Sequence, residues 1–167
     1  KYLSSSWLLE SNKLNVDSFI NLKIYIYIES GGVNMERIAL KSLTGPLNET
    51  EEKSAPPFVY IEGNTNLMLD GPRVSIVGSR KASQKGISNA IILVKALVKK
   101  EVIIVSGLAE GIDTAAHKTA IEEGGKTIAV LGTPLDTCYP KENSKLQQEI
   151  IRDHLVISQF PLKSIVQ

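Results

Sequence analysis

Between residues 74 and 157 the chain repeats one pattern, in which a short apolar run is followed by an amphipathic stretch. Runs that are apolar almost throughout are typical of buried strands, and they fall at 74–77, 102–105, 127–131 and 155–157. The stretches between them carry apolar residues three and four positions apart, which predicts helices that each bury one face. These apolar positions are Ile87, Ala90, Ile91, Val94, Leu97 and Val98; then Ile112, Ala115, Ala116 and Ala120; then Leu146, Ile150 and Ile151.

Cap residues mark two ends of these helices. Gly124 and Gly125 follow the second helix, where glycine is a frequent C-terminal cap. Asn143 precedes the third helix, and its short polar side chain suits an N-cap.

Strands that are apolar throughout and alternate with helices indicate a parallel sheet covered on both faces. The predicted class is α/β, a Rossmann-like three-layer sandwich with a mainly parallel sheet. At least four strands should be parallel, with 74–77 and 102–105 adjacent and central, because both runs are apolar and one helix joins them. Ligands in such sheets bind beyond the carboxyl ends of the strands, so the loops after Val77, Val105 and Leu131 are the places to look for function.

The first 57 residues give a weaker pattern. Residues 22–28 alternate Ile with Lys or Tyr, as a strand would. Residues 48–57 are charged and end in a Pro-Pro pair, which disfavours a helix and predicts a linker. We therefore expect a poorly defined segment over 1–57 and a globular domain over 58–167, with the boundary near Pro57.

Composition excludes several classes of protein. The 167 residues are 43% hydrophobic and 22% charged, which is ordinary for a soluble domain. No stretch approaches the roughly 18 apolar residues of a membrane span, so we expect a cytoplasmic protein without membrane association. The single Cys138 cannot form an internal disulfide or a multi-thiolate metal site.

The net charge of +1 conceals an uneven distribution. The stretch from Arg73 to Lys100 holds seven Lys and Arg residues and no Asp or Glu, so it carries +7 and the remainder −6. Clustered basic charge favours a phosphate-bearing partner. The alternative for Lys95, Lys99 and Lys100 is that they only solvate the outer face and end of a helix.

Two loops carry the candidate binding residues. The loop after Val77 reads Gly78-Ser79-Arg80-Lys81, in which glycine allows close backbone approach and arginine offers the forked donors that suit phosphate. A tight turn with a solvated arginine is the alternative. The loop after Val105 holds Ser106, Gly107 and Gly111, small residues suited to backbone contact at a helix start.

Neither loop matches a nucleotide-cofactor motif. The spacing of Gly107 and Gly111 is not the dinucleotide fingerprint, and no acidic residue ends the second strand to bind ribose. Gly125-Lys126-Thr127 resembles the tail of an ATPase phosphate loop but enters a strand instead of opening a helix. We expect no cofactor.

Asp113 and His117 lie four residues apart and could face one cleft as an acid-base or metal pair. Without a third ligand or a nucleophile in register, a structural or pocket-lining role is favoured, and no metal site is expected. Only one other histidine, His154, is present, and no hydrolytic triad emerges. The sequence therefore favours a binding protein over an enzyme.

Taken in order, these segments resemble the DNA-processing protein A family (DprA/Smf). The resemblance is carried by Pro57-Phe58-Val59-Tyr60 with Gly63, by 74–80, by the run VSGLAEGIDTAAHKTA over 105–120, by 125–131, and by Tyr139-Pro140 with Asn143. It implies a Rossmann-like, non-enzymatic binder of single-stranded DNA that protects incoming DNA and delivers it to a RecA-type recombinase during natural transformation. In that family the two loops line a basic DNA pocket, and Arg80 is the first residue to inherit this role.

The sequence departs from the family at three places. Pro134 stands where the family has Gly, Gln159 stands where it has Glu, and the chain stops before a Phe-Pro-x-Arg-Asn-Arg segment. That segment adds DNA contacts, further strands and much of the dimer surface in the family, so we expect a fragment or a truncated relative. We also expect an unpaired sheet edge beyond the fourth strand, through which the chain would self-associate. A homodimer is an assembly that the resemblance implies.

Two other functions remain open. One is a nucleotide-binding or nucleotide-processing protein of the lysine-decarboxylase-like Rossmann group, whose Pro-Gly-Gly-x-Gly-Thr-x-x-Glu segment this chain lacks. The other is a folded scaffold with a passive basic face.

Overall fold

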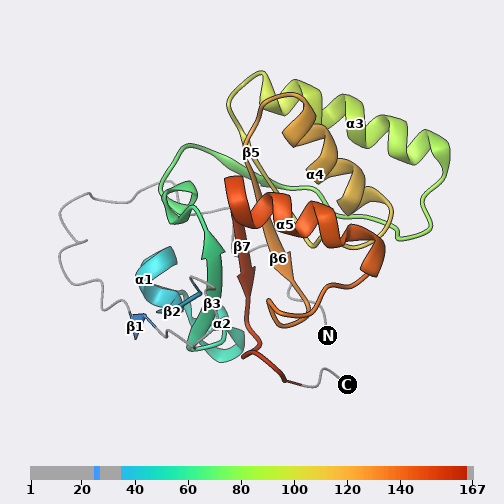
Figure 1. Ribbon diagram of the computed structural model, residues 1–167. Helices are drawn as coiled ribbons and strands as arrows, with labels where there is room; N and C mark the ends of the chain where they lie inside the picture. The colour runs from blue at the N-terminus through green and yellow to red at the C-terminus, as the bar shows by residue number, and fades with distance from the viewer. Residues whose placement is uncertain (1–24, 27–34, 165–167) are drawn as a thin grey trace.

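The computed structural model describes residues 25–26 and 35–164 of the chain. Its seven strands form one sheet in the order β1-β2-β3-β7-β6-β5-β4 (Figure 1). In chain order the elements are β1 (Tyr25–Ile26), β2 (Glu36–Ala39), α1 (Leu40–Thr44), α2 (Glu49–Ser54), β3 (Phe58–Gly63), the 3-10 helix η3 (Thr65–Met68), β4 (Arg73–Ser75), α3 (Gln84–Val98), β5 (Ile103–Ser106), α4 (Ile112–Glu122), β6 (Thr127–Leu131), the 3-10 helix η4 (Lys141–Asn143), α5 (Ser144–Asp153) and β7 (Leu155–Ser158).

The second half of the chain forms the parallel part of the sheet. β4, β5, β6 and β7 pair in parallel and in chain order, and α3, α4 and α5 connect them. The α/β class with four parallel strands is confirmed, and so is the pairing of the first two apolar runs, in which Val74 lies opposite Ile104. None of the helices within the described ranges has the length and apolar content that crossing a bilayer requires.

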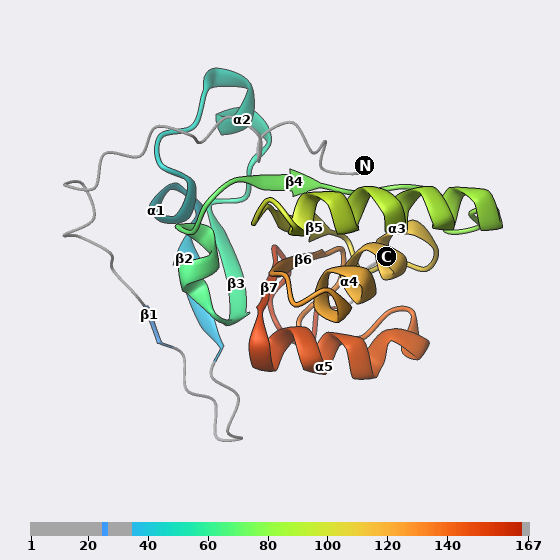
Figure 2. The same ribbon diagram turned by 90° about the horizontal axis from the view of Figure 1, so that it is seen from above.

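The sheet has a different core on each face. Ile104 and Val156 point toward α3, α4 and α5, which all lie on one side of the sheet (Figure 2). Val105 and Ile157, one residue further along the same two strands, point to the other side and pack against α1 and η3. Because successive strand residues alternate between faces, runs that are apolar throughout fit a sheet covered on both sides.

The last strand of the repeat lies inside the sheet. β3 pairs antiparallel with β7, with Tyr60 opposite Ser158, and β2 and β1 extend the sheet beyond β3. The predicted unpaired edge beyond the fourth strand is therefore wrong. A strand that precedes the repeat in the chain occupies that position.

β4 lies at the edge of the sheet. Among the described residues no strand pairs with its outer side, so the predicted central position of 74–77 is wrong. The run is nevertheless apolar because α3 covers one face of it, where Ile76 packs against Val94. Val77, at the end of the run, is 59% exposed.

The packing does not break at the boundary expected near Pro57. β2 pairs with β3, and Leu40 and Leu43 of α1 lie in the same core cluster as Val59. Residues 49–54 of the expected linker form α2, whose N-cap Asn48 accepts hydrogen bonds from two backbone N–H groups. The strand expected over 22–28 is described only at β1, and the rest of that range lies outside the described residues.

Candidate nucleic-acid interface

Three loops meet at the carboxyl ends of the parallel strands. They follow β4, β5 and β6, and because these strands are adjacent and parallel, the loops share one edge of the sheet. The structure brings Ser79 and Arg80 of the first loop against Gly111 of the second, while Gly78 and Gly107 are joined through the carboxylate of Asp113. The loops that were predicted to carry the binding residues therefore lie next to one another.

Asp113 links the first two loops. It stands in the first turn of α4, is buried, and accepts hydrogen bonds from the Gly78 N–H (3.3 Å) and the Gly107 N–H (3.2 Å). Burial raises the pKa of this carboxyl, and the backbone hydrogen bonds together with the charge of Arg80 oppose the rise. The protein itself thus supplies the anion that these two N–H groups and the helix N-terminus would attract.

Gly111 is required by the close approach of two backbones. Its φ of +83° lies in the left-handed region, and a Cβ added here would lie 2.3 Å from the Ser79 carbonyl oxygen and 2.6 Å from that of Arg80. The neighbouring Ile112 N–H donates to the same Ser79 carbonyl (3.3 Å). The backbone of the second loop therefore packs directly against the backbone of the first loop.

Ser79, Arg80 and Lys81 are exposed at the tip of the first loop. The Ser79 hydroxyl accepts a hydrogen bond from the Lys81 N–H (3.1 Å), which fixes the turn. The Arg80 guanidinium lies 6.0 Å from the centre of the Tyr139 ring, at the outer limit of a cation–π contact.

Tyr139 lies beside Arg80, although it is not among the candidate binding residues predicted from the sequence. It belongs to the loop after β6, is 64% exposed, and shares the same edge of the sheet as Arg80. The available signal was an aromatic residue in the third loop of the repeat, since that loop must reach the same edge as the other two.

The side chains of Ser106 and Asn143 turn inward. The Ser106 hydroxyl is buried and donates to the Ile76 carbonyl (2.6 Å), so any ligand contact at Ser106 would have to come from its backbone, as predicted for this loop. The Asn143 side chain makes no cap bond, although Asn143 does occupy the N-cap position of α5. It donates instead to the Leu108 carbonyl (2.9 Å) and to the Thr114 hydroxyl (2.7 Å), which ties α5 to α4.

His117 has partners of its own and does not face Asp113. Its ring is fully buried, and Nδ1 lies 2.7 Å from the hydroxyl of Thr127, which in turn donates to the Ile104 carbonyl. Nε2 has no hydrogen-bond partner among the described residues, although the nearby Ser106 carbonyl favours the charged ring slightly. Burial dominates and lowers the pKa of His117 to about 3, so the ring is neutral.

The basic stretch from Arg73 to Lys100 is divided between two ends of the molecule. Arg80, Lys81 and Lys85 lie at the loops, since α3 begins at Gln84. Arg73 is half-buried at the start of β4 and donates to the Met68 carbonyl (2.8 Å). The remaining cations are on the later part of α3 and just beyond it, where Lys95 pairs with Glu123 (2.6 Å). Three of the seven Lys and Arg residues of this stretch, Arg80, Lys81 and Lys85, therefore lie near the loops.

The chain matches the family model of DNA recombination-mediator protein A over residues 40–167. It belongs to that family. The matched residues include all three loops and every strand from β3 to β7.

Relatives in the family are known from several bacteria. The chain is 48% identical to DNA processing protein DprA of Streptococcus pneumoniae over 115 residues, which are 69% of this chain and 40% of that protein. It is 35% identical to protein Smf of Escherichia coli over 108 residues, 64% of this chain and 29% of that protein. The chain thus spans less than half the length of these relatives.

Two solved structures of the family share the fold. The X-ray structure of DprA from Streptococcus pneumoniae superimposes with a TM-score of 0.63 over 66% of this chain and 38% of that one, at 48% identity. DNA processing protein A from Helicobacter pylori, whose structure describes a single-stranded DNA binding mode, gives a TM-score of 0.67 over 81% of this chain and 60% of that one, at 26% identity.

Replacing Gly111 by alanine should displace the first loop. The new Cβ would meet two backbone carbonyls, so we expect a loss of about 3 kcal/mol in the free energy of unfolding, the sum of overpacking and left-handed strain. Gly124→Ala is the matched control, because Gly124 also has positive φ (+71°) but no atom within 4 Å of an added Cβ. It should cost only about 1 kcal/mol. Urea unfolding followed by circular dichroism measures both, and equal losses would contradict the close approach.

The buried His117 should make the fold sensitive to mild acid. The pKa of His117 is about 3 in the folded state against an ordinary 6.5 in the unfolded chain, so between these pH values only the unfolded chain binds the proton. The free energy of unfolding is therefore unaffected by His117 above pH 6.5. It falls as the pH drops toward 3, by at most about 1.4 kcal/mol per pH unit.

The measurement is the free energy of unfolding in urea at about pH 7, 6 and 5, where few carboxyls titrate. His117→Gln should be less stable at neutral pH but should show a flatter dependence. His154→Gln is the control, because burial also lowers the pKa of His154 and its loss should flatten the profile in part. A parent slope retained by His117→Gln would rule out this assignment.

Proposed function

We propose that this chain is the part of a recombination mediator that holds single-stranded DNA, through the surface formed by Arg80, Lys81, Lys85 and Tyr139. The observation that carries the proposal is that an exposed arginine and an exposed aromatic ring adjoin at the carboxyl edge of the sheet. Cations that bind phosphates and rings that stack on bases are the two elements of sequence-tolerant single-strand binding.

The phosphate contacts would lie at the start of α3. The N-terminus of α4 already holds the Asp113 carboxylate, whereas the first turn of α3 contains no acidic residue. Lys85 stands in that first turn, and Arg80 and Lys81 precede it by a few residues. A backbone phosphate is therefore drawn to α3 and not to α4.

Tyr139 would provide the base contact. Base stacking on an aromatic side chain is worth about 1–3 kcal/mol and discriminates little between bases. With Arg80 beside the ring, one nucleotide can place its base on Tyr139 and its phosphate on the guanidinium.

The comparisons support this proposal. The family is one of recombination mediators, and a relative of 26% identity is described for its binding of single-stranded DNA. Our proposal includes the family-level expectations that the protein is cytoplasmic and acts without catalysis.

Arg80→Ala tests the DNA site. Loss of one charged contact should weaken the binding of labelled oligonucleotides about tenfold for every sequence. The slope of log affinity against log salt should become shallower by about 0.7, the contribution of one phosphate on a single strand. Lys99→Ala is the control, since Lys99 lies beyond the far end of α3 and should change neither quantity appreciably.

Two outcomes would refute this function. One is an Arg80→Ala variant with unchanged affinity and salt slope. The other is a mononucleotide that binds as tightly as a long strand, which would favour the nucleotide-binding alternative.

We further propose that the protein acts as a homodimer and delivers DNA to a RecA-type recombinase. Support for this comes from the family alone, and the chain covers 40% of the length of the pneumococcal relative. The expected results are a dimer in sedimentation of the full-length protein and faster recombinase assembly on oligonucleotides coated with single-strand binding protein. A monomer at all concentrations, or no effect on assembly, would contradict the respective part.

A further inference from the structure

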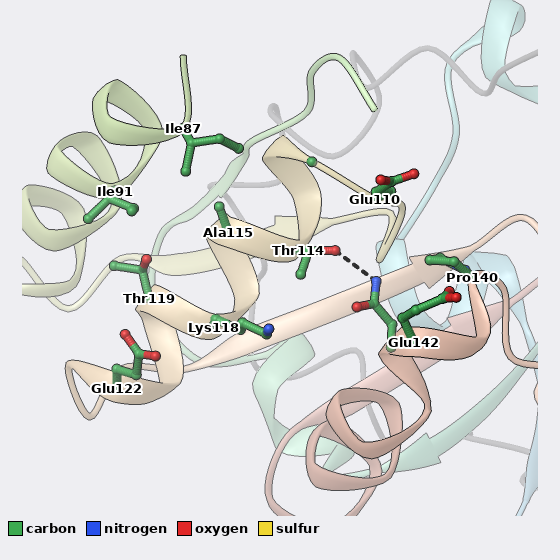
Figure 3. A pocket seen from close by; sticks show the side chains of 12 residues that line it. Ile87, Ile91, Glu110, Thr114, Ala115, Lys118, Thr119, Glu122, Pro140 and Glu142 are labelled. Carbon is green, nitrogen blue, oxygen red and sulfur yellow. Dashed lines mark hydrogen bonds between the residues drawn. The ribbon is translucent and has the colours of Figure 1, made fainter. Parts of the chain in front are cut away.

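A groove of about 670 Å³ lies over α4 (Figure 3). It adjoins the proposed DNA surface, but Arg80, Lys81, Lys85 and Tyr139 are not among its lining residues. Residues of α4 form its floor, α3 forms one wall, and η4 with the residue before it forms the other. The described part of the chain leaves this volume empty.

The α3 wall of the groove is apolar. Ile87 and Ile91 lie one helical turn apart and are only half-buried, and Ala115 of α4 faces them across the floor (Figure 3). Neither isoleucine belongs to the buried core clusters, unlike Val94 one turn further along α3. The groove thus offers a strip onto which apolar side chains at i and i+4 spacing can dock.

The charged residues that line the groove are mainly acidic. Glu110, Glu122 and Glu142 line the groove, and Lys118 is the one cation among its lining residues. None of the three carboxylates has an ion-pair partner within the described part of the chain. Lys95, whose own partner is Glu123, is near enough to Glu122 to sense its charge.

The wall opposite the isoleucines is tied to α4 and to the loop before it by hydrogen bonds. Asn143 is buried there, and its amide donates to Thr114 and to the Leu108 carbonyl, while the Thr114 hydroxyl donates to the Ala109 carbonyl (2.6 Å). A groove whose walls are fixed before binding loses little entropy when a ligand enters.

We propose that this groove binds a basic amphipathic helix of a partner protein. Apolar side chains of the helix pack on Ile87, Ile91 and Ala115, and its Lys or Arg side chains pair with Glu110, Glu122 and Glu142. Nucleic acid is disfavoured, since its phosphates would face three carboxylates against one ammonium.

A partner helix bound in the groove would lie next to the loop that carries Arg80. Gly111 lines the groove on one side and supports the carbonyls of Ser79 and Arg80 on the other. A helix docked here is held beside the DNA loop without covering Arg80.

The probe is a fluorescein-labelled helical peptide of about 14 residues, made of leucine and lysine with leucines on one face. Its binding to the 167-residue chain is followed by anisotropy at low salt. In a sample with labelled isoleucine methyl groups, the resonances of Ile87 and Ile91 should shift. Ile92, 66% exposed on the outer face of α3, is the internal control and should not shift.

Variants test the two parts of the groove separately. Glu122→Gln/Glu142→Gln should weaken the peptide roughly fivefold, the value of two partly screened ion pairs. Ile91→Ser should weaken it roughly tenfold through lost apolar contact. The matched control is Glu49→Gln/Glu149→Gln, which removes the same charge outside the groove and should change affinity less than twofold.

Several results would overturn the proposal. They are a peptide that does not bind, equal binding of a peptide with glutamate in place of lysine, or equal effects of the two double variants. If the groove variants instead abolish self-association in sedimentation without peptide, the occupant is a second copy and the partner-helix proposal is wrong. Oligonucleotide binding is measured on the same variants and should persist, so failure of the DNA site and failure of the groove are distinguishable.

Discussion

The carboxylate of Asp113 occupies the point where two loops and the start of a helix converge. Its oxygens accept hydrogen bonds from the N–H groups of Gly78 and Gly107. An added Cβ would lie 2.8 Å from the Asp113 carboxylate at Gly107 and 2.7 Å from the Ile112 side chain at Gly78, so both positions also require a small residue. A buried carboxylate is costly unless it is hydrogen-bonded, and here the bonds come from backbone that must stay in place for the charge to be tolerated. The interaction therefore couples the positions of the first two loops to the burial of this carboxylate, and it places a negative charge of the protein itself at the N-terminus of α4.

Much of the architecture could be predicted from the sequence because local periodicity determines it. β6 begins and ends at the predicted residues, and α3 and α4 cover the predicted apolar positions. Within each of these elements, the spacing of the apolar residues indicates which positions are buried. The order of the strands in the sheet is not determined by local periodicity. β4 is apolar at an edge because α3 covers it, and β3 reaches β7 from a distant part of the chain. In the structure the residues of β3 alternate between half-buried and buried, but residues 58–61 are apolar throughout, so the sequence does not show this alternation.

The candidate site was predictable at the level of loops and not at the level of side chains. Parallel strands bring their carboxyl ends together, so the positions of Arg80 and Gly111 followed from topology. The direction of a hydroxyl or amide depends on partners that are far away in sequence. Ser106 bonds to Ile76 and Asn143 to Leu108, and neither spacing corresponds to a local motif. The separation of the basic residues between two ends of the molecule could likewise not be predicted without knowing the length and direction of α3.

The antiparallel pairing of β3 with β7 joins segments separated by about 90 residues, and it has a consequence for the order in which the protein matures. During synthesis β2 and β3 leave the ribosome well before β7, and the apolar side chains of α1 and η3 have no opposite face to cover until β5 and β6 exist. Contacts of such long range form slowly, because the intervening chain must be ordered first. The pairing of β3 with β7 can therefore form only after residues 155–158 have been synthesised, and a nascent chain that ends before Leu155 leaves the β7-facing edges of β3 and β6 unpaired.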